Sequence, residues 1–211
     1  MAPQAARRLT LAFDPEVRTA ADGISERILD AALALAGASG LRNLTMDDVA
    51  RRAGVGRMTV YRRFGGKEAL VDALAVRECR RCLARIAAAI DPVAPVEDRI
   101  AALSTTTLAL IHEHPLLERL ARVEPEDLLL ELTRDDSAVF RLVRTFLIEQ
   151  IRGGQEAGEL RGGDPAVLAE VALRLGASFV LMPDSVIPLH DERATHEAIR
   201  ALVGPFIAPR R

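Results

Sequence analysis

The side chains of this chain that could do chemistry are concentrated between positions 45 and 67. The stretch from Arg57 to Phe64 mixes arginines with hydroxyl side chains and one aromatic ring. In a helix, Val60 and Phe64 would face inward and leave the polar side chains on or near the outer face. Guanidinium groups bond base edges bidentately, and a helix with such a face fits a DNA major groove. The outward residues are Arg57, Met58, Thr59, Tyr61, Arg62 and Arg63.

Two short helices joined by a tight turn are predicted to position these side chains. Met46 to Ala53 would form the first helix, capped by Thr45, and Arg57 to Phe64 would form the second. Gly54 stands where the chain must reverse, because glycine accepts the left-handed backbone of such a turn. A helix from Ile24 to Ser39 precedes the pair. Together the three helices predict a compact DNA-binding head.

The rest of the chain is also predicted to be helical. Hydrophobic residues make up 49% of the sequence but aromatic residues only 3%, so Leu, Val, Ile and Ala must build the core. A helix from about Lys67 to Ile90 would span roughly 35 Å and connect the head to a second domain. Further helices are expected at about 96–113, 115–122, 125–133, 137–157, 165–181 and 191–207.

The charge is distributed unevenly along the chain. Residues 1–90 hold 15 Arg or Lys against 10 Asp or Glu, whereas residues 91–211 hold 13 against 20. A basic first part and an acidic second part fit nucleic-acid contact by the first part only. No apolar run approaches the roughly 18 residues of a membrane span, and residues 1–23 lack the apolar centre of a signal peptide. We therefore expect a cytoplasmic protein without a membrane partner.

Two further groups of residues could carry chemistry of another kind. Cys79 and Cys82 form a C-x-x-C pair without the second pair of a zinc site, so we expect two packed, reduced cysteines. Arg80 and Arg81 could lower a thiol pKa, which leaves a redox switch open as the alternative. The run His112-Glu113-His114 is interpreted as a helix end whose histidines cap carbonyls, not as a metal site.

No enzyme class matches the sequence. The chain contains no phosphate-cradling glycine loop, no nucleophile elbow and no H-E-x-x-H motif. We therefore expect no catalytic residues, no metal and no cofactor.

The region from Ile24 to Leu74 resembles the TetR family of bacterial transcriptional repressors. The resemblance rests on Leu44-Thr45-Met46, Val49-Ala50, Ala53-Gly54-Val55, Thr59-Val60-Tyr61, Phe64 and Lys67-Glu68-Ala69-Leu70. It implies that Thr45, Thr59, Tyr61, Arg63 and Lys67 hold DNA phosphates. It also implies that Arg57, Met58 and Arg62 face base edges.

The resemblance also implies the domain organisation and the function. The fold would be all-α, with an N-terminal three-helix helix-turn-helix DNA-binding head and a C-terminal helical ligand-binding and dimerisation domain. The expected divisions are 1–23, a flexible N-terminal arm; 24–66, the DNA-binding domain; 67–90, the connecting helix; and 91–211, the second domain. The expected function is a homodimeric repressor that binds a palindromic double-stranded DNA operator and is released by a small hydrophobic effector.

The resemblance predicts where the second domain pairs and binds its effector. The dimer contact is expected on Leu168, Val171, Ala172, Leu175 and Gly176. The pocket is expected among Leu103, Thr107, Leu110, Leu116, Leu120, Phe140, Val143, Leu147 and Phe179. The alternative is a ligand-binding or redox-responsive helical protein, acting through Cys79 and Cys82, with little sequence-specific DNA binding.

Overall fold

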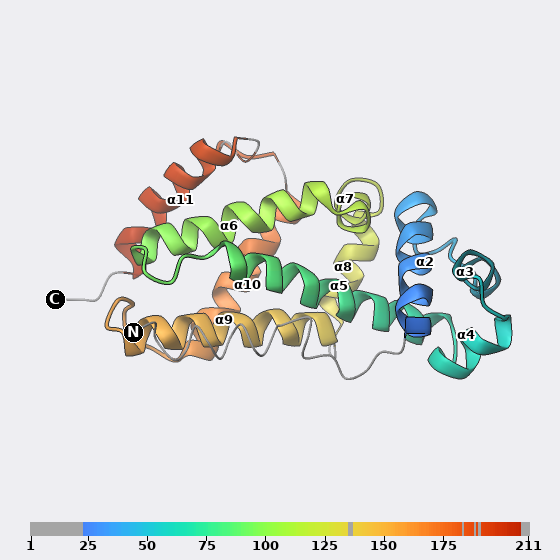
Figure 1. Ribbon diagram of the computed structural model, residues 1–211. Coiled ribbons are helices and arrows are strands. Elements are labelled where there is room, and N and C mark those ends of the chain that lie inside the picture. Colours follow the sequence, from blue (N-terminus) through green and yellow to red (C-terminus); the bar gives the residue numbers. More distant parts are fainter. Residues whose placement is uncertain (1–22, 135–136, 183, 188, 190, 208–211) are drawn as a thin grey trace.

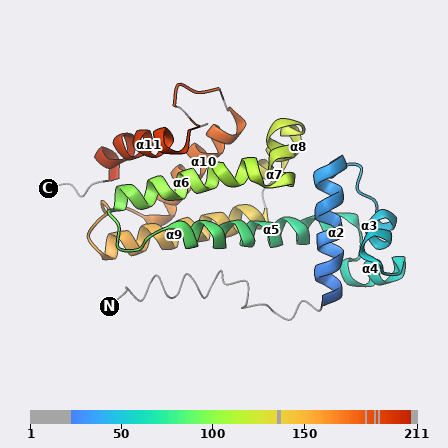
Figure 2. The ribbon, with the colours of Figure 1, turned by 45° about the horizontal axis from the view of Figure 1, so that its top comes forward.

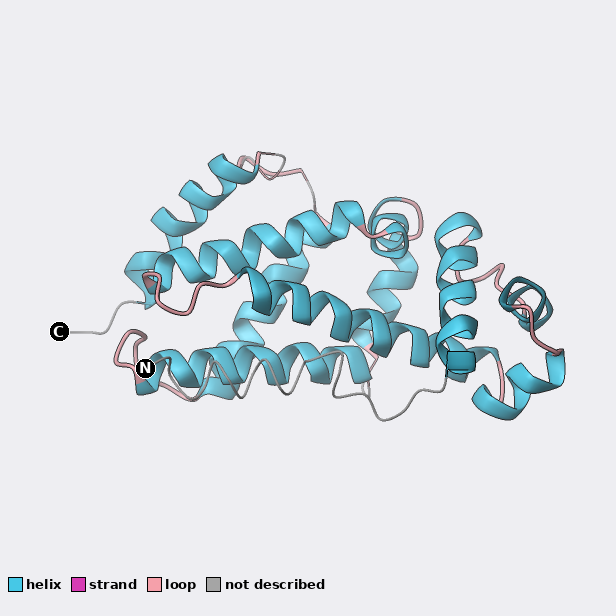
Figure 3. Ribbon diagram, viewed as in Figure 1, coloured by secondary structure: helices cyan, strands magenta, loops and turns pink. Residues whose placement is uncertain are grey.

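The computed structural model describes residues 23–134, 137–182, 184–187, 189 and 191–207 (Figure 1). In these residues the chain forms helices and no strand (Figure 3), which confirms the predicted all-α fold. The predicted N-terminal arm lies outside the described residues except for Gly23.

The helices begin and end close to the predicted positions. The head consists of α2 (Gly23–Ser39), α3 (Met46–Ala53) and α4 (Arg57–Phe64), and the connecting helix is α5 (Lys67–Ala89). The second domain follows with α6 (Val96–Glu113), α7 (Pro115–Arg122), α8 (Pro125–Thr133), α9 (Ala138–Glu156), α10 (Pro165–Leu181) and α11 (Glu192–Ile207).

Local side-chain chemistry fixes the helix ends around the turn of the head. The hydroxyl of Thr45 accepts a hydrogen bond from the backbone N–H of Asp48 at 3.1 Å and so caps α3. Gly54 ends α3 in the left-handed conformation, at φ +64° and ψ +38°, and its N–H bonds the carbonyl of Arg51 at 3.3 Å. The backbone can therefore reverse within three residues, and α4 begins directly after Gly56.

One hydrophobic core holds α4 in place. Ile28 of α2, Val49 of α3, Val60 of α4 and Leu74 of α5 are all fully buried. Burying each such side chain stabilises the fold by roughly 1.5–3 kcal/mol. Leu116 of α7 joins the same core, so the second domain contributes to the packing of the head.

A second core lies further along the connecting helix. Leu83 and Ile86 of α5 pack with Leu110 of α6 and Phe146 of α9. Outside this core, α10 packs on α9 and α11 packs on α6. None of the described helices is both long enough and apolar enough to cross a membrane.

The connecting helix separates the two ends of the molecule. Helices α3 and α4 lie at one end and α11 lies at the other, in both orientations shown (Figures 1 and 2). The head therefore presents α4 well away from the outer helices of the second domain.

The end of α2 allows a stability test. Gly40 has a φ of +87°, and a Cβ atom there would collide with the carboxylate of Glu124. We expect Gly40→Ala to lower the free energy of unfolding by about 2–3 kcal/mol, because it combines backbone strain with displacement of that side chain. Gly54→Ala is the control, since Gly54 also has a positive φ but has open space around it. Denaturant unfolding should show the larger loss at Gly40, and equal losses would contradict the contact with Glu124.

Candidate nucleic-acid interface

Helix α4 exposes the three residues that were expected to face base edges. Arg57, Met58 and Arg62 are all exposed, and Met58 is 76% accessible. Val60, between them, is fully buried and attaches the helix to the head. In the described part of the chain no residue pairs with Arg62, so its guanidinium is available to a ligand.

Arg57 is held by two neighbours. Its Nε lies 2.9 Å from one carboxylate oxygen of Asp47 in α3, and its Nη1 donates to the other at 3.1 Å. The guanidinium also lies over the Tyr61 ring, 5.4 Å from the centroid. The neighbouring Tyr61 and the charge of Asp47 raise the pKa of Arg57 further above its already high value.

The predicted phosphate contacts of α4 are less exposed than its base-facing residues. Thr59, Tyr61 and Arg63 are half-buried, and Tyr61 packs against the head core. Arg63 turns toward α2, where its Nη1 donates to the hydroxyl of Ser25 at 3.0 Å. The phosphate contacts of these three residues remain predictions.

Thr45 and Lys67 lie at the starts of α3 and α5 and already make bonds within the protein. The Thr45 hydroxyl, besides capping α3, donates to the Asp48 carboxylate at 2.6 Å. The Lys67 ammonium donates to the carbonyl of Arg42 at 2.7 Å. An ammonium has three N–H donors, so two remain for a phosphate.

Two arginines that hold the head together had not been predicted. Arg27 of α2 donates to the carbonyls of Ala53 and Gly54, at 3.1 and 3.5 Å, and thereby fixes the turn before α4. Arg42 pairs with Asp127 of α8 at 2.5 Å. Arg42 thus links α8 to the loop between α2 and α3, and its own carbonyl accepts the hydrogen bond from Lys67.

A largely buried polar network joins the head to the second domain. Glu78 of α5 has a side chain that is only 8% exposed and lies 2.7 Å from Arg77 and 3.2 Å from Arg81. Both arginines also pair with Glu26 of α2. On its other side, Glu78 lies 3.1 Å from Nε2 of His114. One carboxylate therefore connects α2 to the junction of α6 and α7.

The charge state of this carboxylate follows from its surroundings. Burial raises the pKa of Glu78, but the hydrogen bond with His114 and the positive charges of Arg77 and Arg81 outweigh burial. The pKa of Glu78 therefore lies below its ordinary value. Nδ1 of His114 accepts a hydrogen bond from the N–H of Leu117 at 3.4 Å, so Nε2 carries the hydrogen donated to Glu78.

The two cysteines do not fit the redox alternative, in which neighbouring arginines would lower a thiol pKa. Burial raises the pKa of Cys79 to about 12, and Arg80 offsets only part of this shift. Burial and the charge of Glu78 raise the pKa of Cys82 to about 11, against a smaller opposing effect of Arg85. Both thiols are therefore protonated at neutral pH and are poor nucleophiles.

The two histidines near the end of α6 have different roles. Nδ1 of His112 lies 2.8 Å from the carbonyl of Leu108, as expected for a histidine at a helix end. His114 instead caps the beginning of α7 and contacts Glu78. Within the described ranges, no group of three potential metal ligands comes together.

The predicted pocket residues are divided between the two cores. Leu116 and Leu120 belong to the core of the head, whereas Leu110 belongs to the second core with Leu103, Val143 and Leu147 packed against it. Thr107 donates to the carbonyl of Leu103 at 2.7 Å. Phe140 and Phe179 are half-buried. A shared cavity for these residues remains a prediction.

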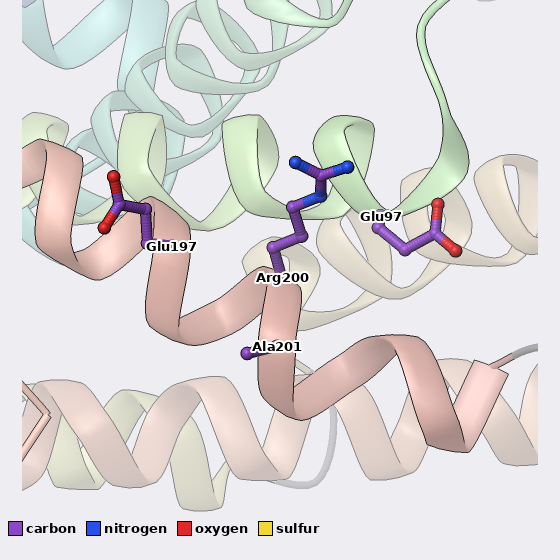
Figure 4. Close-up of a pocket in the computed structure, with 4 residues that line it drawn as sticks. All are labelled: Glu97, Glu197, Arg200 and Ala201. Carbon is purple, nitrogen blue, oxygen red and sulfur yellow. The ribbon is translucent and has the colours of Figure 1, made fainter.

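An open groove is present elsewhere, between α6 and α11. Glu97, Glu197, Arg200 and Ala201 line it (Figure 4). Arg200 is paired with Asp98 of α6 at 3.2 Å. The groove is mixed in charge and does not match the hydrophobic effector expected from the sequence.

The predicted dimer contact is largely accessible on α10. Val171, Ala172, Leu175 and Gly176 are exposed, while Leu168 is half-buried. Val167, not among the predicted residues, extends the exposed face by one turn, because it stands four residues before Val171. Three large apolar side chains, each more than half exposed, thus form a stripe along the helix.

Comparisons with known proteins agree with this arrangement. Residues 28–74 match the family model for bacterial regulatory proteins of the tetR family. An uncharacterized HTH-type transcriptional regulator of Mycobacterium tuberculosis is 27% identical, covering 88% of this chain and 86% of the relative. The HTH-type transcriptional regulator AlkX of the same species is 28% identical, covering 77% of this chain and 75% of AlkX.

A solved structure has the same fold. The TetR family repressor AlkX from Dietzia sp., implicated in biodegradation of n-alkanes, superimposes with a TM-score of 0.62 at 20% identity. The superposition covers 86% of this chain and 94% of the Dietzia chain. The head and the relatives agree: residues 28–74 match the tetR family of bacterial regulatory proteins, and the chain as a whole is similar to HTH-type transcriptional regulators.

Proposed function

We propose that the protein is a cytoplasmic repressor that binds a palindromic operator as a homodimer and is released by a small hydrophobic effector. The observation that carries the proposal is the exposed face of α4, with Arg57, Met58 and Arg62 on a helix fixed by Val60. A two-fold dimer would place two such helices in successive major grooves, about 34–36 Å apart.

Arg62 is the strongest candidate for direct base recognition in this proposal. It is exposed and has no partner in the described part of the chain, so binding a base breaks no bond within the protein. An arginine can bond the O6 and N7 atoms of guanine bidentately, which is worth about 1–3 kcal/mol of discrimination.

The exposed stripe of α10 supports the homodimer. Val167, Val171 and Leu175 present apolar surface to water, and Ala172 and Gly176 beside them allow a second helix to approach closely. A two-fold contact uses the same surface on both subunits, so one such stripe is sufficient.

The buried network around Glu78 supports control by an effector. A ligand can release DNA only by binding one conformation better than the DNA-bound one. Because Glu78 contacts both the arginines paired with α2 and His114 of the second domain, a shift of α5 would reach the head directly. Because the Dietzia repressor is implicated in biodegradation of n-alkanes, n-alkanes are the first effectors to test.

The test is a binding titration against DNA from around the protein's own gene, at two salt concentrations. Arg62→Ala should weaken binding about 5- to 150-fold for each half-site of the preferred operator, because each subunit loses one bidentate contact. Arg152→Ala is the control, since Arg152 is an exposed arginine of α9, far from the head. Wild-type binding should fall as salt rises. Binding without sequence preference, or equal losses in both variants, would contradict the proposal.

A further inference from the structure

Asp47 lies beside Arg57, on the face of the head that is proposed to meet DNA, where its charge would be unfavourable for binding. It belongs to the first turn of α3, and its side chain is 58% exposed. A carboxylate beside a phosphate backbone weakens association, because DNA binding depends on neutralising phosphates with cations. The ion pair with Arg57, whose side chain is 60% exposed, adds little to the stability of the fold. General affinity therefore does not explain Asp47, and its place in the first turn gives α3 only a modest stabilisation through the helix dipole.

The contacts of Asp47 fix the plane of the Arg57 guanidinium. Two nitrogens of Arg57 face the two carboxylate oxygens, at 2.9 and 3.1 Å, and the Tyr61 ring lies 5.4 Å away. The carboxylate belongs to α3 and the ring to α4, so Arg57 is held from two helices. A guanidinium has five N–H donors, and two are engaged with Asp47, so three remain for DNA.

We infer that Asp47 is a positioning residue that directs Arg57 to a base edge and thereby contributes to operator selectivity. An untethered arginine at this position can turn to a phosphate, which gives affinity but no sequence information. The tethered guanidinium loses less conformational freedom when it binds a guanine. The inference rests on the proposed operator binding and concerns the specificity of the same site.

The experiment compares Asp47→Asn with the wild type on an operator and on variants of it with single base-pair changes. We expect selectivity at one base pair to fall about tenfold in Asp47→Asn. Binding to unrelated DNA should strengthen and depend more steeply on salt, because one repulsive charge is removed. Glu68→Gln is the matched control, because it removes one exposed carboxylate at the start of α5, next to the head, without changing Arg57. This control should leave the pattern of selectivity unchanged.

A double-mutant cycle with Arg57→Ala separates positioning from other effects of Asp47. In the Arg57→Ala background, Asp47→Asn should no longer reduce selectivity, because no guanidinium remains to be positioned. Unchanged selectivity in Asp47→Asn, or additive losses in the double variant, would overturn the inference while leaving operator binding intact. A wild-type protein without sequence preference would instead refute the proposed function itself.

Discussion

A Leu175→Glu variant is expected to be monomeric and to bind its operator about 10²- to 10⁴-fold more weakly than the wild type. Leu175 is 58% exposed on α10, in line with Val167 and Val171. In a two-fold contact the new carboxylates of both subunits would enter the same apolar interface, unpaired and desolvated. The loss is large because the second half-site is then no longer bound intramolecularly.

The control for this variant is Val93→Glu. Val93 is 80% exposed in the connection between α5 and α6, so the substitution adds the same charge to an apolar position outside α10. Sedimentation should show a dimer for the wild type and for Val93→Glu, and a monomer for Leu175→Glu. A Leu175→Glu dimer with unchanged operator affinity would show that subunits pair through another surface.

The fold could be predicted because its signals are local. Asp164 caps α10 through the N–H of Ala166 at 2.8 Å, with Pro165 in the first turn. Glu124 likewise precedes Pro125 at the start of α8, although its side chain makes no capping hydrogen bond there. Such caps and the helical spacing of apolar residues involve neighbours in sequence, so they can be recognised without the fold.

The contacts that join elements could not be predicted, because they involve single polar residues distant in sequence. Arg27 and Gly54 are 27 residues apart, and Arg42 and Asp127 are 85 apart. One exposed arginine in a helix is indistinguishable in sequence from one that bonds a distant carbonyl. The contact of Glu78 with His114 could not be predicted for the same reason, because these two residues are also distant in sequence.

The exposed and buried faces of α4 could be predicted from the sequence, but the residues that its side chains contact could not. Helical spacing correctly placed Val60 in the core and left Arg57, Met58 and Arg62 outside. Arg63 lies at the edge of that face, where a long side chain can reach α2 as well as solvent. The Arg63 side chain turns to α2 because Ser25 accepts its hydrogen bond there. The position of Ser25 relative to Arg63 depends on how α2 and α4 pack, which the sequence does not show.

Removal of the buried carboxylate in a Glu78→Ala variant is expected to lower the free energy of unfolding by about 3 kcal/mol. Breaking a buried ion pair by removing one partner typically costs 3–5 kcal/mol, since the other charge stays buried. The lower end applies because Arg77 keeps Glu26 and Asp30, at 3.3 and 2.7 Å. The control, Glu113→Ala, removes an exposed carboxylate paired with exposed Arg85 and should cost about 0–1 kcal/mol.

The pH dependence of stability tests the same contacts independently. The folded pKa of Glu78 lies below its ordinary value, so the ionised carboxylate contributes stability at pH values above the unfolded pKa, about 4.3. This contribution is lost as the pH falls through the lower folded pKa. Denaturant unfolding at pH 7 should therefore separate wild type from Glu78→Ala more widely than unfolding below pH 4. A difference that stays constant over this range would mean that the contribution of Glu78 is packing rather than charge. The contact between the head and the second domain would then not depend on the ion pairs of Glu78.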